Sequence, residues 1–192
     1  MASMSANLRN YLVSIFGFEH VIRSVPASAW DNPSPCDKWT ARDVTGHSMA
    51  VISNVASRAG VGDSADPFAD PPGTFAGDDP LVTWYAVRDR LLTALDHRGA
   101  LQTELKSSLG TMTVDAFVGL MIADCTIHTW DLARAAGVDE RLDPMLVDYV
   151  QRDLEQRKPE MLRAPHRYGE AVDATAEHDA QTRMLLFTGR RP

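Results

Sequence analysis

The chain has 192 residues, 44% of them hydrophobic, and a formal net charge of −7 at neutral pH. A chain of this size can bury a core and is most simply one domain, which we take as residues 1–192. The acidic balance and the scattered Lys and Arg residues offer no basic surface, so we expect no nucleic-acid partner.

Nothing in the sequence indicates a membrane or secreted protein. The longest apolar run, at about residues 116–127, is too short to span a bilayer and contains Asp124. The N-terminal region lacks a basic stretch followed by uninterrupted apolar residues. With only two cysteines, a reduced compartment is expected, with Cys36 a packed loop residue and Cys125 a core helix residue. We therefore expect a cytoplasmic protein without a membrane partner.

Hydrophobic periodicity predicts four main helices, at about residues 4–25, 41–58, 81–97 and 113–136. Thr40, followed three residues later by Asp43, is typical of a helix N-cap with an acidic partner. Gly137 is expected to end the fourth helix as a C-cap glycine. No strand is expected. The predicted fold class is thus all-α, an up-and-down four-helix bundle.

The connections and the C-terminal part are less regular. Residues 60–79 contain glycines, prolines and five aspartates but no cation, which predicts a long structureless loop, either mobile or a lid. We favour the mobile alternative. An additional helix is predicted at about residues 144–157, followed after Pro165 by an irregular tail with a final apolar turn at residues 184–187.

The fourth predicted helix is hydrophobic almost all round, which is typical of a helix buried by its neighbours. Steps of three and four residues place one line of side chains along it: Phe117, Met121, Asp124, His128, Asp131 and Ala135. The sequence has no Lys or Arg between residues 107 and 133. An unpaired buried carboxylate would cost several kcal/mol or more, so Asp124 needs a cation.

A divalent metal ion would supply that charge. The D-x-x-x-H spacing presents Asp124 and His128 to one point, and His47 interrupts the apolar stripe of the second helix in the same way. We therefore predict His47, Asp124 and His128 as metal ligands that join distant helices. The alternative is that each histidine is a satisfied core residue.

Asp131 lies one turn beyond His128, and two interpretations stay open. Its carboxylate could accept the imidazole N–H of His128 and so orient the metal ligand. It could instead pair with an arginine, such as Arg134 or Arg42. The remaining histidines lie in amphipathic or irregular contexts and are expected to be solvated: His20, His97, His166 and His178.

Two segments carry a family resemblance, residues 35–47 (PCDKWTARDVTGH) and residues 124–137 (DCTIHTWDLARAAG). They resemble the metal-binding DinB-like families of actinobacteria, close to the N-terminal domain of mycothiol-dependent maleylpyruvate isomerase. The resemblance implies a DinB-like four-helix bundle with a divalent metal, usually zinc, although Ni²⁺, Fe²⁺ or Co²⁺ would also suit the site. His47, Asp124 and His128 fall on the positions of the family's metal ligands.

There are two departures from the isomerase. It has Glu where this chain has Asp124, and it has an additional C-terminal domain that helps complete its active site. Maleylpyruvate isomerisation is therefore not the expected reaction, and the short relatives are often thiol S-transferases. The resemblance implies mycothiol as cosubstrate.

Three functions follow for a metal site with one open position. The first is a thiol transferase or isomerase that joins a low-molecular-weight thiol to an electrophilic substrate. The second is a hydrolase or lyase that uses activated water. The third is a non-enzymatic stress-response bundle in which the metal links helices. The first is favoured, no catalytic residue beyond the ligands is assigned, and the sequence leaves a homodimer open.

Overall fold

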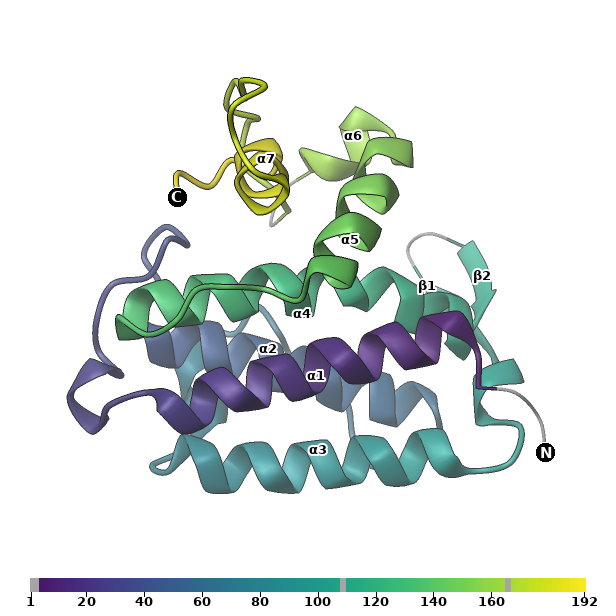
Figure 1. Cartoon of the computed structure of the whole chain (residues 1–192). Coiled ribbons are helices and arrows are strands. Elements are labelled where there is room, and N and C mark those ends of the chain that lie inside the picture. The colour runs from purple at the N-terminus through teal and green to yellow at the C-terminus, as the bar shows by residue number, and fades with distance from the viewer. Residues whose placement is uncertain (1–3, 108–109, 165–166) are drawn as a thin grey trace.

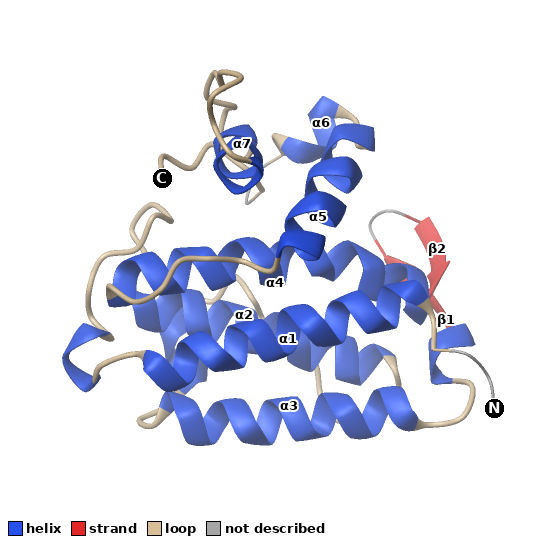
Figure 2. Cartoon of the chain, viewed as in Figure 1, coloured by secondary structure: helices blue, strands red, loops and turns tan. Residues whose placement is uncertain are grey.

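The computed structural model describes residues 4–107, 110–164 and 167–192. Four long helices lie side by side as a bundle, and the chain after them forms a separate set of short helices above α4 (Figures 1 and 2). The four bundle helices are α1 (Ala6–Ser24), α2 (Ala41–Arg58), α3 (Pro80–Asp96) and α4 (Val114–Ala136). The predicted helical bundle is confirmed.

Local sequence signals set the helix ends. The side chain of Thr40 accepts a hydrogen bond from the backbone N–H of Asp43, and the Asp43 carboxylate accepts one from the N–H of Thr40. This reciprocal pair satisfies two N–H groups that a helix start leaves free, as predicted. At the C-terminal end of α4, Gly137 takes a left-handed φ of 67° and ends the helix.

The connection between α2 and α3 is packed against the bundle. Within it, Pro72–Ala76 forms the 3₁₀ helix η2, in which Pro72, Gly73 and Ala76 are buried. Asp43 accepts a hydrogen bond from Gly73 N–H at 2.9 Å, which ties η2 to the start of α2. The expectation of a structureless connection is therefore wrong for η2. Contacts with residues distant in sequence, such as the capping residue Asp43, keep this segment ordered.

Because of this connection, the directions of the helices differ from the expected up-and-down order. It returns the chain along α2, and the guanidinium of Arg42 donates to the carbonyl of Gly77 at 2.7 Å. As a result α3 begins beside the start of α2, and the two helices run in the same direction (Figure 1). The helices α1 and α4 run in the opposite direction.

A short hairpin precedes α4, where no strand was expected. Its strands are β1 (Glu104–Ser107) and β2 (Gly110–Thr113), which pair antiparallel. Each strand has four residues, and Leu105 is the buried apolar residue of the pair. Strands this short do not contain enough alternation to be recognised from hydrophobic period.

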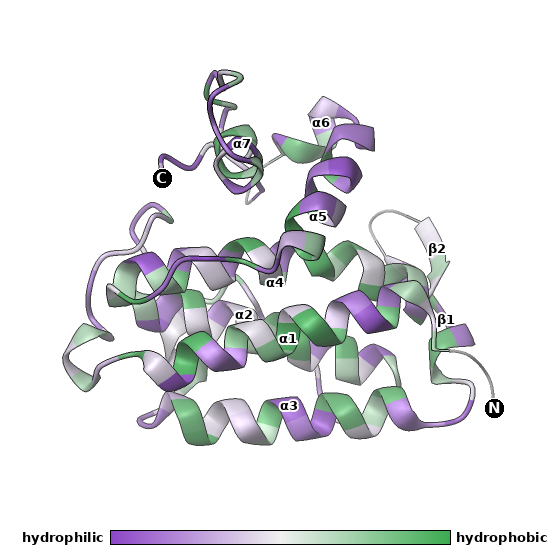
Figure 3. Cartoon of the chain, in the orientation of Figure 1, coloured by the Kyte–Doolittle hydropathy of each residue, from purple (hydrophilic) through white to green (hydrophobic). Residues whose placement is uncertain are grey.

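Beyond the bundle the chain forms α5 (Pro144–Gln156), α6 (Pro159–Leu162) and α7 (Ala180–Phe187), while the 3₁₀ helices η1 (Ala27–Ala29) and η3 (Ala100–Gln102) lie in bundle connections. The predicted apolar turn at residues 184–187 is the end of α7, whose residues Met184, Leu185 and Leu186 are buried. Apolar and polar patches alternate along the helices, as expected when one face of each packs inward (Figure 3). None of the helices in the described part of the chain combines the length and the apolar character that a membrane span requires.

Gly46 offers a test of the packing between α2 and η2. A Cβ at this position would overlap the carbonyl oxygen of Pro72 and lie 2.9 Å from Gly73 Cα. We expect Gly46→Ala to lower the free energy of unfolding by about 1–3 kcal/mol, as overpacking does. Urea unfolding would measure this. The matched control is Gly17→Ala in α1, where a Cβ meets nothing within 4 Å and stability should rise by about 0.5–1 kcal/mol. Equal effects of the two substitutions would contradict the contact.

Candidate metal centre

Three side chains from two helices meet at a cavity. His47 comes from α2, and Asp124 and His128 lie one turn apart on α4. The Nε2 atoms of both histidines are 3.7 Å from the same carboxylate oxygen, Oδ1 of Asp124. One potential ligand atom from each residue lies within 4.8 Å of the other two. The structure thus brings together the three residues that interrupt the apolar stripes, and metal binding by them stays a prediction.

These distances suit a single cation. Ligand atoms about 2.1 Å from a tetrahedral ion lie roughly 3.4 Å from one another. The two distances of 3.7 Å between Nε2 atoms and Asp124 Oδ1 exceed this by only a few tenths of an ångström. Small side-chain rotations would close that difference.

The Nε2 atom of His47 has no hydrogen-bond partner among the described residues, although it is buried. The other ring nitrogen, Nδ1, lies 2.7 Å from the carbonyl oxygen of Pro67. Because a carbonyl can only accept, Nδ1 carries a proton, and in the neutral imidazole Nε2 then directs its lone pair toward Asp124. A buried lone pair that faces a carboxylate oxygen is unfavourable unless a proton or a metal ion lies between them. The residues present therefore fit a bound metal ion.

Asp124 is available as an anionic ligand. Burial alone would raise the pKa of its carboxyl group, but the interactions of Asp124 with His128, His47 and Arg167 outweigh burial and lower that pKa to about 2. Burial lowers the pKa of His47, and the adjacent Asp124 raises it by more, so the net shift is upward. The Asp124 side chain keeps 28% of its surface exposed, against 4% for His47. The carboxylate is therefore the ligand that solvent or a substrate reaches most easily.

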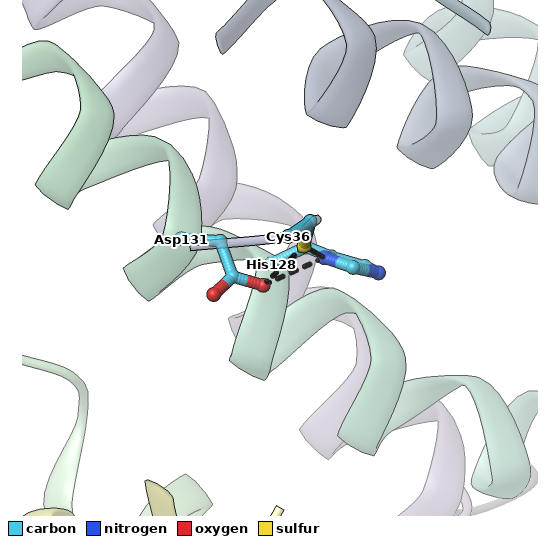
Figure 4. A group of neighbouring side chains, drawn as sticks. All are labelled: Cys36, His128 and Asp131. Atoms are coloured by element: carbon cyan, nitrogen blue, oxygen red, sulfur yellow. Dashed lines mark hydrogen bonds and ion pairs between the residues drawn. The ribbon is translucent and has the colours of Figure 1, made fainter. Parts of the chain in front are cut away.

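His128 is held from its far side by Asp131. Its Nδ1 atom donates to Asp131 Oδ2 at 2.9 Å, and Asp131 is fully buried. Figure 4 shows this pair on α4 with Cys36 beside it. The predicted contact between Asp131 and the imidazole is present. Asp131 also has an arginine partner, but this is Arg190, with its Nη2 atom 2.8 Å from Oδ2.

The two arginines considered from the sequence lie elsewhere. Arg134 pairs with Glu140, and the guanidinium of Arg42 donates to a backbone carbonyl and lies over Trp30. Arg190 is far from Asp131 in sequence, so helical spacing gave no signal for it. It follows α7, which lies above α4 (Figure 1) and packs against α5.

Cys36, His128 and Asp131 form a second group whose atoms lie close enough to hold a metal. The thiol of Cys36 donates to Asp131 Oδ2 at 3.3 Å and lies 3.9 Å from His128 Nδ1. The guanidinium of Arg190 already lies against both Asp131 and the Cys36 sulfur, so a fixed cation is present. Burial raises the pKa of the Cys36 thiol, which disfavours the thiolate that a metal would need. We interpret this group as a hydrogen-bond network.

The ligand group opens onto a cavity of about 570 Å³. Trp39 packs on both histidine rings, with centroid distances of 4.9 Å to His47 and 6.1 Å to His128. Phe68 lies against His47 at 5.6 Å and is half exposed at the cavity rim. The C-terminal segment supplies much of the remaining wall, including Arg157, Arg167, Tyr168, Gly189 and Arg190.

Sequence reasoning missed these wall residues because they come from loops and from the C-terminal segment, where no periodicity applies. The expectation for the other histidines holds for His20 and His97, which are exposed. His178 is half-buried, and its Nδ1 accepts the N–H of Thr175. His166 lies outside the described residues. Burial raises the pKa of Cys125 to about 12, as suits a core thiol.

Comparisons with known proteins agree with this architecture. Two uncharacterized proteins of Mycobacterium tuberculosis, from two strains, are each 30% identical over 129 residues, which is 67% of this chain and 66% of theirs. A crystal structure of the mycothiol-dependent maleylpyruvate isomerase, a mutant with one histidine replaced by alanine, superposes with a TM-score of 0.58 at 13% identity. That match covers 78% of this chain and 68% of the isomerase chain, and it supports the fold.

A family model described as the mycothiol maleylpyruvate isomerase N-terminal domain matches residues 18–133, more than half of the chain. The protein therefore belongs to this DinB-like family.

Proposed function

We propose that the protein is a divalent-metal-dependent thiol transferase or isomerase, with His47, Asp124 and His128 as the metal ligands. The observation that carries the proposal is the buried Nε2 atom of His47, which has no hydrogen-bond partner in the described part of the chain and faces Asp124 Oδ1 at 3.7 Å beside a cavity of about 570 Å³. A structural metal site would have all its ligand positions closed by protein. Three protein ligands beside a cavity leave a position for a substrate.

The donor set favours zinc. Two imidazole nitrogens and one carboxylate oxygen suit Zn²⁺, and Ni²⁺, Fe²⁺ and Co²⁺ are the alternatives. When bound there, such an ion would favour the thiolate form of a thiol substrate at neutral pH. The protein's own part is to fix the ligands: Pro67 holds the ring of His47, and Asp131 holds the ring of His128.

The residues that line the cavity beside the ligands give a reason to expect small charged substrates. Arg167 is exposed there, it forms no salt bridge among the described residues, and its charge acts on Asp124. Arg157 is paired with Asp153, and burial raises the pKa of Tyr168 to about 12, so its hydroxyl stays protonated as a donor. Leu120 and Met121 add apolar surface. This combination suits a thiol and an electrophile that carry polar or anionic groups.

Mycothiol is the thiol we propose, because the family and the isomerase of similar fold are both named for it. The electrophile is a small molecule whose reacting carbon must reach the open side of the ligand group. The first part of the proposal, metal binding, and the second, thiol chemistry, can be tested separately.

The test of the proposed function is whether substrate consumption needs a thiol. We expect the zinc-loaded chain to consume an electrophile such as chlorodinitrobenzene in the presence of mycothiol and not in its absence. A chelator should abolish the rate. Turnover of an ester without thiol would instead indicate hydrolysis, and no turnover together with a large loss of thermal stability on chelation would indicate a structural metal.

A further inference from the structure

Arg190 is a buried cation that the proposed chemistry does not use directly. Its side chain is 11% exposed, and two of its nitrogens contact Asp131: Nη2 with Oδ2 at 2.8 Å and Nε with Oδ1 at 3.2 Å. This two-point contact fixes the plane of the carboxylate as well as its position. The same Oδ2 atom accepts the N–H of His128.

The backbone turn after α7 directs the Arg190 side chain toward Asp131. Gly189 has a φ of 84°, in the left-handed region, and a Cβ there would lie 2.9 Å from backbone atoms of Gly169. The N–H groups of Gly189 and Arg190 donate to the carbonyls of Leu186 and Leu185, both at 3.0 Å. The turn therefore bends the chain back toward α4 immediately before Arg190.

We propose that Arg190 is a positioning residue for the metal site, which acts through Asp131 to set the ring orientation and tautomer of His128. This inference rests on the proposed function in so far as His128 is a metal ligand. The guanidinium supplies the counter-charge of Asp131, so His128 provides only a hydrogen bond from Nδ1. Its Nε2 lone pair is thereby left to face Asp124 and the cavity.

The geometry distinguishes this role from simple anchoring of the C-terminal segment. Anchoring is already provided by Met184, Leu185 and Leu186, which are buried. The guanidinium, in contrast, contacts Asp131, the Cys36 sulfur and the carbonyl of Thr188. Two of these three partners belong to the network behind His128.

The test compares Arg190→Ala and Arg190→Lys with Arg191→Ala, whose side chain is exposed one residue further on. We expect Arg190→Ala to weaken zinc affinity by roughly 10–100-fold, as loss of a supporting group does. Arg190→Lys, which keeps the charge but not the two-point contact, should lie between, and Arg191→Ala should bind zinc as the unchanged protein does. A double-mutant cycle with Asp131→Asn should show effects that do not add.

A second readout needs neither metal nor activity. In the full chain freed of metal, at about pH 8, the ¹⁵N shifts of His128 should show a protonated Nδ1 and an unprotonated Nε2, and Arg190→Ala should alter them. The proposal is overturned if Arg190→Ala leaves zinc affinity and these shifts unchanged and lowers only the melting temperature, or if its effect adds to that of Asp131→Asn. Failure of the proposed function would look different, since thiol-dependent turnover would be absent while these readouts behaved as expected.

Discussion

Alanine at His47 or His128 should remove the divalent metal from the purified protein. Each substitution deletes one of three proposed ligands, and the two that remain cannot neutralise and enclose the ion. We expect affinity to fall by more than the roughly 10–100-fold typical of a lost supporting group. Metal content by mass spectrometry and affinity by competition with a chromophoric chelator would measure the effect.

The matched control is His97→Ala, which removes an exposed histidine from the end of α3. It should leave metal content unchanged. Because His47 is buried, His47→Gln provides a second variant of similar size, and circular dichroism would show whether each variant keeps its helices. Retention of one tightly bound ion by the His47→Ala, His128→Ala double variant would refute the ligand assignment.

Asp124→Asn should also lose the metal, whereas Asp124→Glu should keep it. Asparagine keeps the shape of the side chain but removes the negative charge that faces both imidazoles, and we expect a loss of at least about a hundredfold in affinity, or roughly 2.8 kcal/mol. Glutamate, the residue that the isomerase resemblance implies here, keeps the charge on a longer arm. Its expected effect is a changed thiol-dependent rate at nearly full metal content.

Asp173→Asn is the control for this pair, because Asp173 is exposed and is not among the residues that line the cavity. Equal metal affinity of the Asp124→Asn variant and the unchanged protein would show that the carboxylate is not a ligand. Cobalt substitution gives an independent measurement: the visible spectrum should respond to added thiol in the unchanged protein and in Asp124→Glu. A spectrum that does not change with any thiol tried would contradict the thiol-based function. It would not contradict the metal site.

Much of the fold could be predicted from the sequence, because the signals that set helix ends and buried faces are local. The capping pair of Thr40 and Asp43 and the left-handed glycine Gly137 fix helix ends through contacts within a few residues. The apolar stripes fix which faces turn inward. The hairpin of β1 and β2 and the helix η2 were missed because short elements depend on what they pack against more than on their own sequence pattern.

Some features of the candidate site could also be predicted from local sequence signals, and others could not. Asp124, His128 and Asp131 share one face of α4 by helical spacing, and His47 stands out as polar in an apolar stripe, so the sequence alone selects them. Which atoms face one another is decided only by the tertiary structure. The carbonyl of Pro67 accepts the Nδ1 proton of His47. Arg190, 59 residues from Asp131 in the sequence, pairs with the Asp131 carboxylate. Such contacts join segments whose separation carries no periodicity, and a buried charge is satisfied by whichever group the fold brings beside it.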